Sequence, residues 1–205
     1  MLVERPPRVF RSLFRGARWT VPAGSVALTF DDGPHPDVTP WVLDELDAQG
    51  VKATFFMVGD NARRWPALVE EALARGHAVG NHTMHHLQGL KVSKDAYLTD
   101  LAEASLYIPG SLFRPPHGML RLSQLREIRK SREVIMYDIV SRDYDSRLSA
   151  DEVYDNVRRY ARSGSIIVFH DSLKAERNLR GSLRRSIEWL KTQGYEFVTL
   201  PMAKR

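Results

Sequence analysis

The chain has 205 residues, of which 43% are hydrophobic, and it carries a formal net charge of +5. This length and composition fit one globular domain with a sizeable core. Cysteine is absent, so disulfides and thiolate ligands are excluded, and any metal site must be built from His, Asp and Glu. No stretch approaches the roughly 20 apolar residues of a membrane-spanning helix or the ~7–15-residue apolar core of a secretory signal. We therefore expect no transmembrane segment and a cytoplasmic location.

The positive charge is concentrated at the front of the chain. Residues 1–23 form a basic segment, in which apolar side chains of residues 8–18 recur at helical spacing opposite several arginines. Docking of residues 8–18 on an anionic membrane surface is one interpretation, but we favour a helix packed on the domain formed by residues 24–205. Nucleic-acid binding is not expected, because the remaining basic residues are mixed with acids and form no stripe with aromatics.

Short apolar runs and amphipathic stretches alternate along the rest of the chain. The apolar runs predict strands, at residues 26–30, 53–58, 78–79, 112–113, 134–137, 165–169 and 195–200. Helical spacing of apolar residues predicts helices between them, near residues 40–49, 62–75, 94–107, 122–131, 149–162 and 176–192. Seven β/α units of this kind favour a parallel sheet, open or closed into a barrel, with functional residues at the carboxyl ends of the strands.

Two clusters of chemical side chains follow the first and third predicted strands. Asp31 and Asp32 end the first strand, where paired carboxylates are costly unless a cation or a hydrogen-bond donor receives them. His82, His85 and His86 fall within five residues after the third strand. If this segment is helical, two of the imidazoles share one face at i, i+4. Two histidines and one carboxylate leave coordination positions open, as in catalytic metal sites. These residues alone decide neither between His85 and His86 nor between the two aspartates.

Further candidates follow the later strands. Arg114 ends the fourth strand in a proline-rich loop, which can hold a guanidinium against a carboxylate and can direct the amide of His117 at a developing oxyanion. His170 ends the sixth strand, and histidine has the intrinsic pKa of a general acid. Asp143, after the fifth strand, could orient that imidazole. All these side chains would line one mouth of the sheet.

Taken together, five motifs resemble those of the polysaccharide deacetylases, carbohydrate esterase family 4. They are Thr29-Phe30-Asp31-Asp32-Gly33-Pro34, His82-Thr83-Met84-His85-His86, Arg114-Pro115-Pro116-His117-Gly118, Asp143-Tyr144 and Val168-Phe169-His170. The similarity extends from about residue 24 to Leu200. It implies an α/β fold, a distorted TIM-barrel-like (β/α)7 barrel. It also implies metal-dependent removal of N-acetyl groups from N-acetylglucosamine-containing saccharides of the chitooligosaccharide or peptidoglycan type.

The resemblance also implies a role for each matching residue. Asp31 would be the general base and His170, held by Asp143, the general acid. Arg114 would orient the base, and the backbone N–H of His117 would help to bind the oxyanion. The implied metal ligands are Asp32, His82 and His86, and the implied substrate contacts are Pro116, Tyr144 and Val168. The cofactor would be a divalent metal: zinc suits the ligand set, and cobalt, nickel, manganese or iron would fit the same groups.

Four positions depart from the family's pattern. Val140, Tyr144, Val168 and His117 stand where many relatives have aspartate, tryptophan, leucine and tyrosine, and these changes reshape the expected sugar groove. The alternatives are therefore an amide hydrolase acting on a non-carbohydrate substrate and a catalytically retired saccharide-binding domain. A non-haem Fe(II) oxygenase shares the ligand set, but the β/α alternation and the flanking Asp31 and His170 count against it.

Overall fold

The structure, a computed structural model, describes residues 4–200. Its strands are β1 (Ser25–Asp31), β2 (Thr54–Met57), β3 (Ala78–Asn81), β4 (Leu112–Phe113), β5 (Glu133–Val134), β6 (Ile139–Val140), β7 (Ile166–His170) and β8 (Glu196–Phe197). They form one curled sheet in the order β5-β4-β3-β2-β1-β7-β6, and β8 pairs with the first residues of β1. Every pairing is parallel. The predicted distorted (β/α)7 barrel is confirmed.

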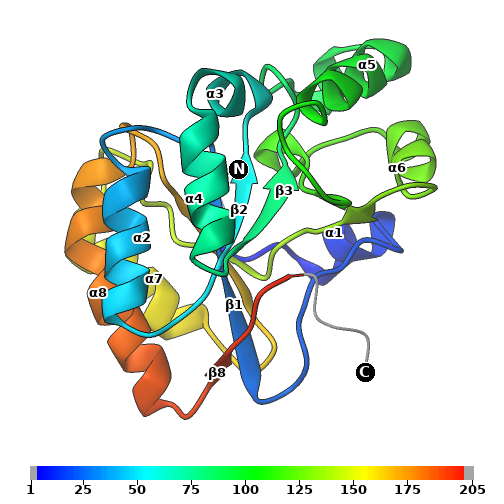
Figure 1. Cartoon of the computed structure of the whole chain (residues 1–205). Coiled ribbons are helices and arrows are strands. Elements are labelled where there is room, and N and C mark those ends of the chain that lie inside the picture. Colours follow the sequence, from blue (N-terminus) through cyan, green and yellow to red (C-terminus); the bar gives the residue numbers. More distant parts are fainter. Residues whose placement is uncertain (1–3, 201–205) are drawn as a thin grey trace.

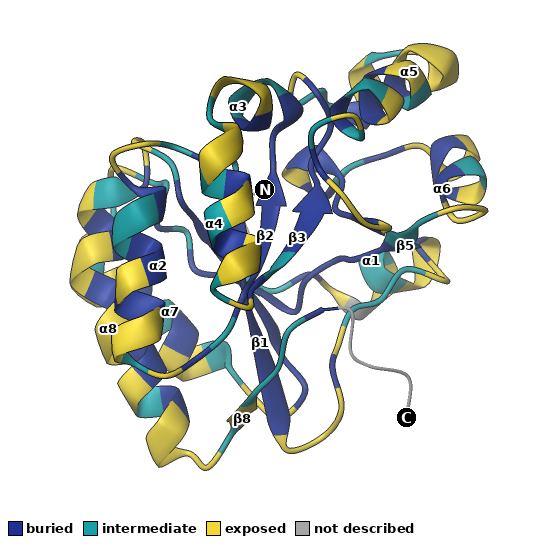
Figure 2. Cartoon of the chain, viewed as in Figure 1, coloured by how far each residue is buried: buried dark blue, intermediate teal, exposed yellow. Residues whose placement is uncertain are grey.

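Helices cover the outside of this sheet. They are α1 (Arg8–Leu13), α2 (Thr39–Ala48), α3 (Gly59–Arg64), α4 (Pro66–Ala74), α5 (Lys94–Ala104), α6 (Leu122–Ile128), α7 (Ala150–Tyr160) and α8 (Glu176–Thr192). In Figure 1, α2, α7 and α8 lie together on one side of β1, whereas α1, α5 and α6 lie on the other. The helices are exposed outward and the central strands are buried, as Figure 2 shows. No helix within residues 4–200 has the length and apolar character needed to cross a membrane.

The centre of the core is β1, which is buried at all seven residues. Phe30 of this strand pairs in register with Phe55 of β2 and Phe169 of β7. The three rings stack, with centroids 5.0 and 6.1 Å from that of Phe30, so the strands interlock through large apolar surfaces. This packing fixes the strand end at which Asp31 and Asp32 emerge.

Two predicted elements differ from the observed ones. The predicted helix 62–75 is divided between α3 and α4 because Pro66 lacks a backbone N–H and disfavours a helical conformation at the preceding residue. The predicted strand 134–137 was also wrong, since only its first residue belongs to β5 and a separate strand, β6, comes before Asp143. Asp143 therefore follows β6, the neighbour of β7, and not the strand assigned to it.

The N-terminal segment lies between the two ends of the sheet, β5 and β6. The Arg18 amide donates to the Val134 carbonyl at 2.8 Å, and the Met136 amide donates to the Arg18 carbonyl at 2.7 Å. On the other side, the Val140 amide donates to the Glu4 carbonyl at 2.8 Å. The segment thus forms backbone hydrogen bonds with both ends of the sheet.

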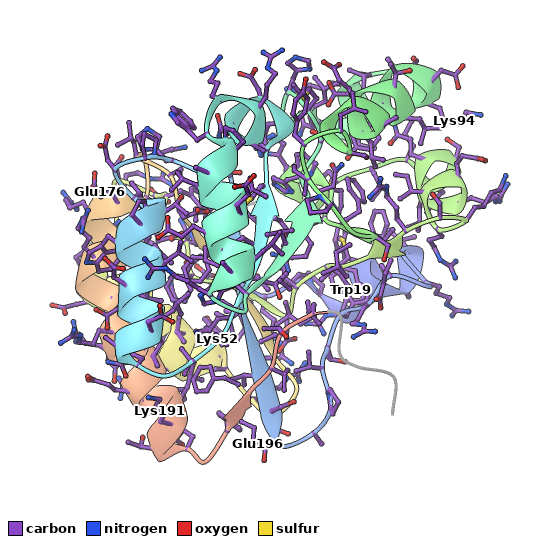
Figure 3. All side chains as sticks on the ribbon, in the orientation of Figure 1. Trp19, Lys52, Lys94, Glu176, Lys191 and Glu196 are labelled. Carbon is purple, nitrogen blue, oxygen red and sulfur yellow. The ribbon has the colours of Figure 1, made fainter. Side chains whose placement is uncertain are left out.

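Helix α1 packs on the barrel, although it is shorter than predicted. It ends at Leu13, and Gly16 has a φ of +93°, so helix does not extend to residue 18. Phe14 is buried, and the ring of Phe10 contacts Phe14 and Trp19, with centroids 5.0 and 6.0 Å apart. Figure 3 shows Trp19 beside this helix. The domain boundary expected at residue 23 stays a prediction.

A buried carboxylate holds the N-terminal segment in place. Asp138, in the connection from β5 to β6, is fully buried and contacts the guanidinium groups of Arg5, Arg11 and Arg162. The Ser165 hydroxyl donates to the same carboxylate at 2.8 Å. A buried charge is tolerated when it is paired and hydrogen-bonded in this way.

Replacing this carboxylate should destabilise the fold. Asp138→Asn is expected to lower the free energy of unfolding by about 2–4 kcal/mol, because several guanidinium groups lose a buried anion. Urea unfolding followed by circular dichroism measures the change. Asp155→Asn is the matched control, since its ion pair with Arg158 is exposed and should contribute less than about 1 kcal/mol. Equal losses for the two variants would contradict the structural role of Asp138.

Candidate active site

The candidate residues gather at the carboxyl ends of five strands. Asp31 of β1 pairs in register with His170 of β7, and the register of β3 with β4 brings His82 beside Arg114. A cavity of about 320 Å³ opens there, at the low end of the range for ligand pockets. Of the predicted site residues, those that line the cavity are Asp31, Asp32, His82, His86, His117, Tyr144, Val168 and His170.

Three side chains that could bind a metal, Asp32, His82 and His86, lie together in the cavity and are called the metal-ligand cluster below. The Nε2 atoms of His86 and His82 lie 3.1 and 3.6 Å from Oδ1 of Asp32, and the three ligand atoms lie within 4.8 Å of one another. Asp32 Oδ1 is buried and has no hydrogen-bond partner within residues 4–200. A carboxylate oxygen left unpaired beside two imidazole nitrogens is costly unless a cation binds it. The residues present therefore fit a divalent metal with two histidines and one carboxylate.

Neighbouring groups orient the two imidazoles. His82 Nδ1 lies 2.8 Å from the carbonyl oxygen of Arg114; because a carbonyl can only accept, Nδ1 carries the hydrogen and Nε2 keeps its lone pair for a metal. Burial lowers the pKa of His82 to about 4, which keeps this imidazole neutral, as a ligand must be. The ring of His86 packs against that of His117, with centroids 4.7 Å apart.

The histidine segment is not helical. Thr83 and His86 have φ values of +64° and +54°, so the condition for the i, i+4 arrangement, a helical segment, is not met. His82 and His86 are brought together by an irregular turn. His85 points elsewhere: its Nδ1 lies 2.6 Å from Oδ1 of Asp100, and 54% of its side chain is exposed. The structure thus groups His86, and not His85, with Asp32.

The candidate base, Asp31, is held by a buried arginine. Arg114 Nη1 donates to Asp31 Oδ1 at 2.6 Å and to the Thr29 hydroxyl at 2.7 Å. The guanidinium lies over the ring of Phe56, 4.1 Å from its centroid. One oxygen of Asp31 is therefore fixed, while Oδ2 lies 4.0 Å from His82 Nε2, next to the metal-ligand cluster.

The candidate acid, His170, is held by Asp143. Its backbone amide donates to Asp143 Oδ2 at 2.8 Å, and its Nδ1 lies 2.7 Å from Oδ1. Burial alone would lower the pKa of His170, but the carboxylates around it, Asp143 first and then Asp32 and Asp31, together outweigh burial and raise it to about 9. The imidazole is therefore protonated at neutral pH. Asn178 of α8 donates to the Asp143 carbonyl at 3.1 Å and fixes the loop.

Sequence reasoning missed several residues of this region. Tyr137 and Lys174 also line the cavity; Tyr137 ends a predicted strand, but Lys174 belongs to no motif that could have found it. Pro116 is buried and lies outside the cavity wall, so its contact with substrate stays a prediction.

Asp171, directly after His170, was also not predicted. It is buried, accepts from the Thr39 hydroxyl at 2.6 Å through Oδ2, and has no partner for Oδ1 among the described residues. Gly33 fits against it because a Cβ there would lie 2.1 Å from Oδ2. Burial raises the pKa of Asp171 to about 8, so this carboxyl is neutral at neutral pH.

A parallel β/α barrel that brings a candidate acid and a candidate base beside a possible metal site at its strand ends has the arrangement expected of a hydrolase. Residues 19–134 match the polysaccharide deacetylase family. The chain belongs to this family.

Individual relatives agree with this assignment. The chain is 36% identical to a peptidoglycan-N-acetylglucosamine deacetylase of Bacillus cereus, and the match covers 86% of this chain and 66% of that relative. It is 32% identical to a chitooligosaccharide deacetylase of Azorhizobium caulinodans, with 92% and 99% covered. A solved structure of a peptidoglycan N-acetylglucosamine deacetylase, bound to 4-naphthalen-1-yl-N-oxidanyl-benzamide, superposes with a TM-score of 0.87 at 31% identity, covering 96% of this chain and 95% of that one.

The grouping of ligands can be tested by metal binding. His82→Ala and His86→Ala should each weaken zinc binding to metal-stripped protein by more than about tenfold, because each removes a ligand from a set of three. Isothermal titration calorimetry measures the affinity. His85→Ala removes an imidazole one residue away and should bind zinc as the wild type does. Loss of zinc binding in His85→Ala with retention in His86→Ala would reverse the assignment.

Asp171 should make stability depend on pH. An unfolded aspartate ionises near pH 3.9, whereas Asp171 in the folded chain does so near pH 8, so the folded state binds the extra proton between these values. Its contribution to stability is therefore complete below about pH 4 and is lost as pH rises toward 8, by up to about 1.4 kcal/mol per pH unit. Asp171→Asn keeps the neutral shape and should flatten this dependence in urea unfolding from pH 5 to 8. Parallel curves for wild type and variant would show that Asp171 is ionised.

Proposed function

We propose that the chain is a metal-dependent hydrolase that removes N-acetyl groups from N-acetylglucosamine-containing saccharides and releases acetate. The observation that carries the proposal is one cavity in which Asp31, fixed by Arg114, and His170, fixed by Asp143, flank the metal-ligand cluster. The names of the relatives, which act on peptidoglycan and chitooligosaccharide, support this substrate class.

Different residues of the chain carry out different steps of amide hydrolysis. A divalent cation held by Asp32, His82 and His86, for which zinc is our first choice, would polarise the acetyl carbonyl and acidify water. Asp31 accepts the proton of the attacking water. The backbone N–H of His117 donates to the oxyanion of the tetrahedral species.

Collapse of this species needs a proton on the leaving nitrogen. His170 is protonated at neutral pH and donates that proton as the C–N bond breaks, so acetate and a free amine are released. Arg114 and Asp143 do not react; they keep the base and the acid oriented. The balance is one water consumed for each amide cleaved.

The competing functions fit the site less well. An Fe(II) oxygenase has no use for the acid–base pair that flanks the cluster, and a retired binding domain has no reason to keep both orienting partners. The substituted groove positions Val140, Tyr144, Val168 and His117 all belong to the cavity wall, so they bear on substrate choice. The expected cytoplasmic location stays a prediction.

Acetate release tests the function directly. Metal-stripped protein should release no acetate from N-acetylglucosamine oligomers or from peptidoglycan, and added zinc or cobalt should restore release from at least one of them. Zinc binding without acetate release from either polymer would reject the proposed substrate class.

The assigned acid and base can be tested separately from the metal. Asp31→Asn and His170→Ala should each lower kcat by about 10²–10⁴-fold, as loss of a general base or acid does, while zinc binding is retained. His85→Ala is the matched control and should keep full activity. In the wild type, kcat should fall as pH rises through about 9, because His170 then loses the proton it donates. Full activity in either variant would remove that residue from the mechanism.

A further inference from the structure

Lys174 is a cation at the mouth of the cavity. It lies on the loop between β7 and α8, and its exposed side chain lines the cavity. Its Nζ lies 5.4 Å from the centroid of the Tyr144 ring, and that ring meets the His170 imidazole edge-on, with centroids 4.8 Å apart. Lys174 is thus one aromatic ring away from the candidate general acid.

The neighbouring charges leave this ammonium group without an anionic partner. Within residues 4–200, no carboxylate forms an ion pair with Lys174, and Glu176, two residues on, pairs with Arg180 at 2.9 Å instead. Two of the other charged groups at the cavity are paired within the protein, Asp31 with Arg114 and His170 with Asp143, and in the proposed function Asp32 binds the metal. Lys174 is therefore a cation at the mouth that the proposed chemistry does not use.

We infer that Lys174 selects acidic glycans, in which a sugar next to the deacetylated N-acetylglucosamine carries a carboxylate, as the lactyl ether of a muramic acid unit does. This inference rests on the proposed function and narrows its substrate class. An ammonium group offers a point charge and three donors, which suit a carboxylate on a flexible arm. A neutral N-acetylglucosamine oligomer would offer it only uncharged hydroxyl and acetamido groups.

The position of Lys174 also fits the arrangement of the cavity. In the proposed reaction the acetyl group occupies the space beside Asp31 and the metal-ligand cluster, so a carboxylate on the neighbouring sugar has to lie elsewhere along the cavity. The wall formed by Tyr144 and Lys174 offers such a place, with a cation beside it. The acetyl group can then approach the acid–base pair while the carboxylate stays at the rim.

The test compares three substrates of equal sugar length. The first is the neutral N-acetylglucosamine tetramer; the second is a tetrasaccharide of alternating N-acetylglucosamine and N-acetylmuramic acid with free lactyl carboxylates. The third carries stem peptides, whose amide bonds remove the lactyl charges and place carboxylates farther away. Acetate release gives kcat and KM for each substrate, and mass spectrometry locates the deacetylated sugar. The variants are Lys174→Met, Lys174→Arg and, as a control outside the cavity, Lys130→Met.

Lys174→Met should lower the ratio of kcat/KM for an acidic glycan to that for the neutral tetramer by about three- to tenfold, chiefly through KM. Lys174→Arg should retain most of the ratio, and Lys130→Met should retain all of it. The difference should shrink in 0.5 M salt, because the contact is exposed and screened. A loss confined to the peptide-free glycan assigns the lactyl carboxylate as the partner, and a loss confined to the peptide-bearing glycan assigns a peptide carboxylate.

Two results would count against the inference, and they differ from a failure of the proposed function. If the ratio of kcat/KM values is unchanged in Lys174→Met, or if kcat/KM for the neutral tetramer falls equally, Lys174 does not recognise a substrate carboxylate. Wild-type protein that releases acetate from none of the three substrates would instead reject the proposed function itself.

Discussion

The buried contact between Arg114 and Asp31 is the constraint on which the site depends. A fully buried guanidinium is tolerated only when an anion and further acceptors receive it, and removal of its partner leaves an uncompensated charge. Arg114 meets this requirement through Asp31 and Thr29, with Phe56 beneath it. The carbonyl of the same residue receives Nδ1 of His82. One residue thus orients both the candidate base and a candidate metal ligand, so their relative positions cannot change independently.

Each candidate reacting group is held by a residue that follows a different strand. Arg114 after β4 reaches across the sheet to hold Asp31 of β1, and Asp143 after β6 holds His170 of the neighbouring strand β7. The supporting strands β4 and β6 have two residues each and lie toward opposite ends of the sheet, where few backbone pairs fix them. The N-terminal segment forms backbone hydrogen bonds with both β5 and β6, and Asp138 holds it in place. It therefore connects the two ends of the sheet. The packing of residues 4–20 thus supports the geometry of the candidate acid and base.

The sequence predicted what depends on local pattern and missed what depends on tertiary contacts. Strand β1 was predictable because it is long and apolar, and the spacing of its carboxylates and of the histidine cluster indicated a metal site. Strand β6 was missed because two residues carry no periodicity, and only its pairing with β7 defines it. The turn that joins His82 to His86 needs a positive φ at Thr83, whose amide is held by the Asn81 side chain at 2.8 Å. Lys174 lines the cavity because the fold places the loop between β7 and α8 at its mouth, which no local sequence pattern indicates.

The distribution of charge at the site favours the binding of a cation beside Asp32. Within the described residues, the cavity holds two matched pairs, which are Asp31 with Arg114 and Asp143 with His170. Asp171 is neutral at neutral pH because burial raises its pKa, so it adds no further negative charge beside the imidazolium. Asp32 differs, since its histidine neighbours lower its pKa against the effect of burial, while burial keeps His82 neutral. Among the described residues, no guanidinium or ammonium group pairs with this carboxylate, and its Oδ1 lies where two imidazole nitrogens converge. A divalent cation would both balance the charge of Asp32 and be coordinated by the imidazole nitrogens. A cationic protein side chain in the same place would only balance the charge.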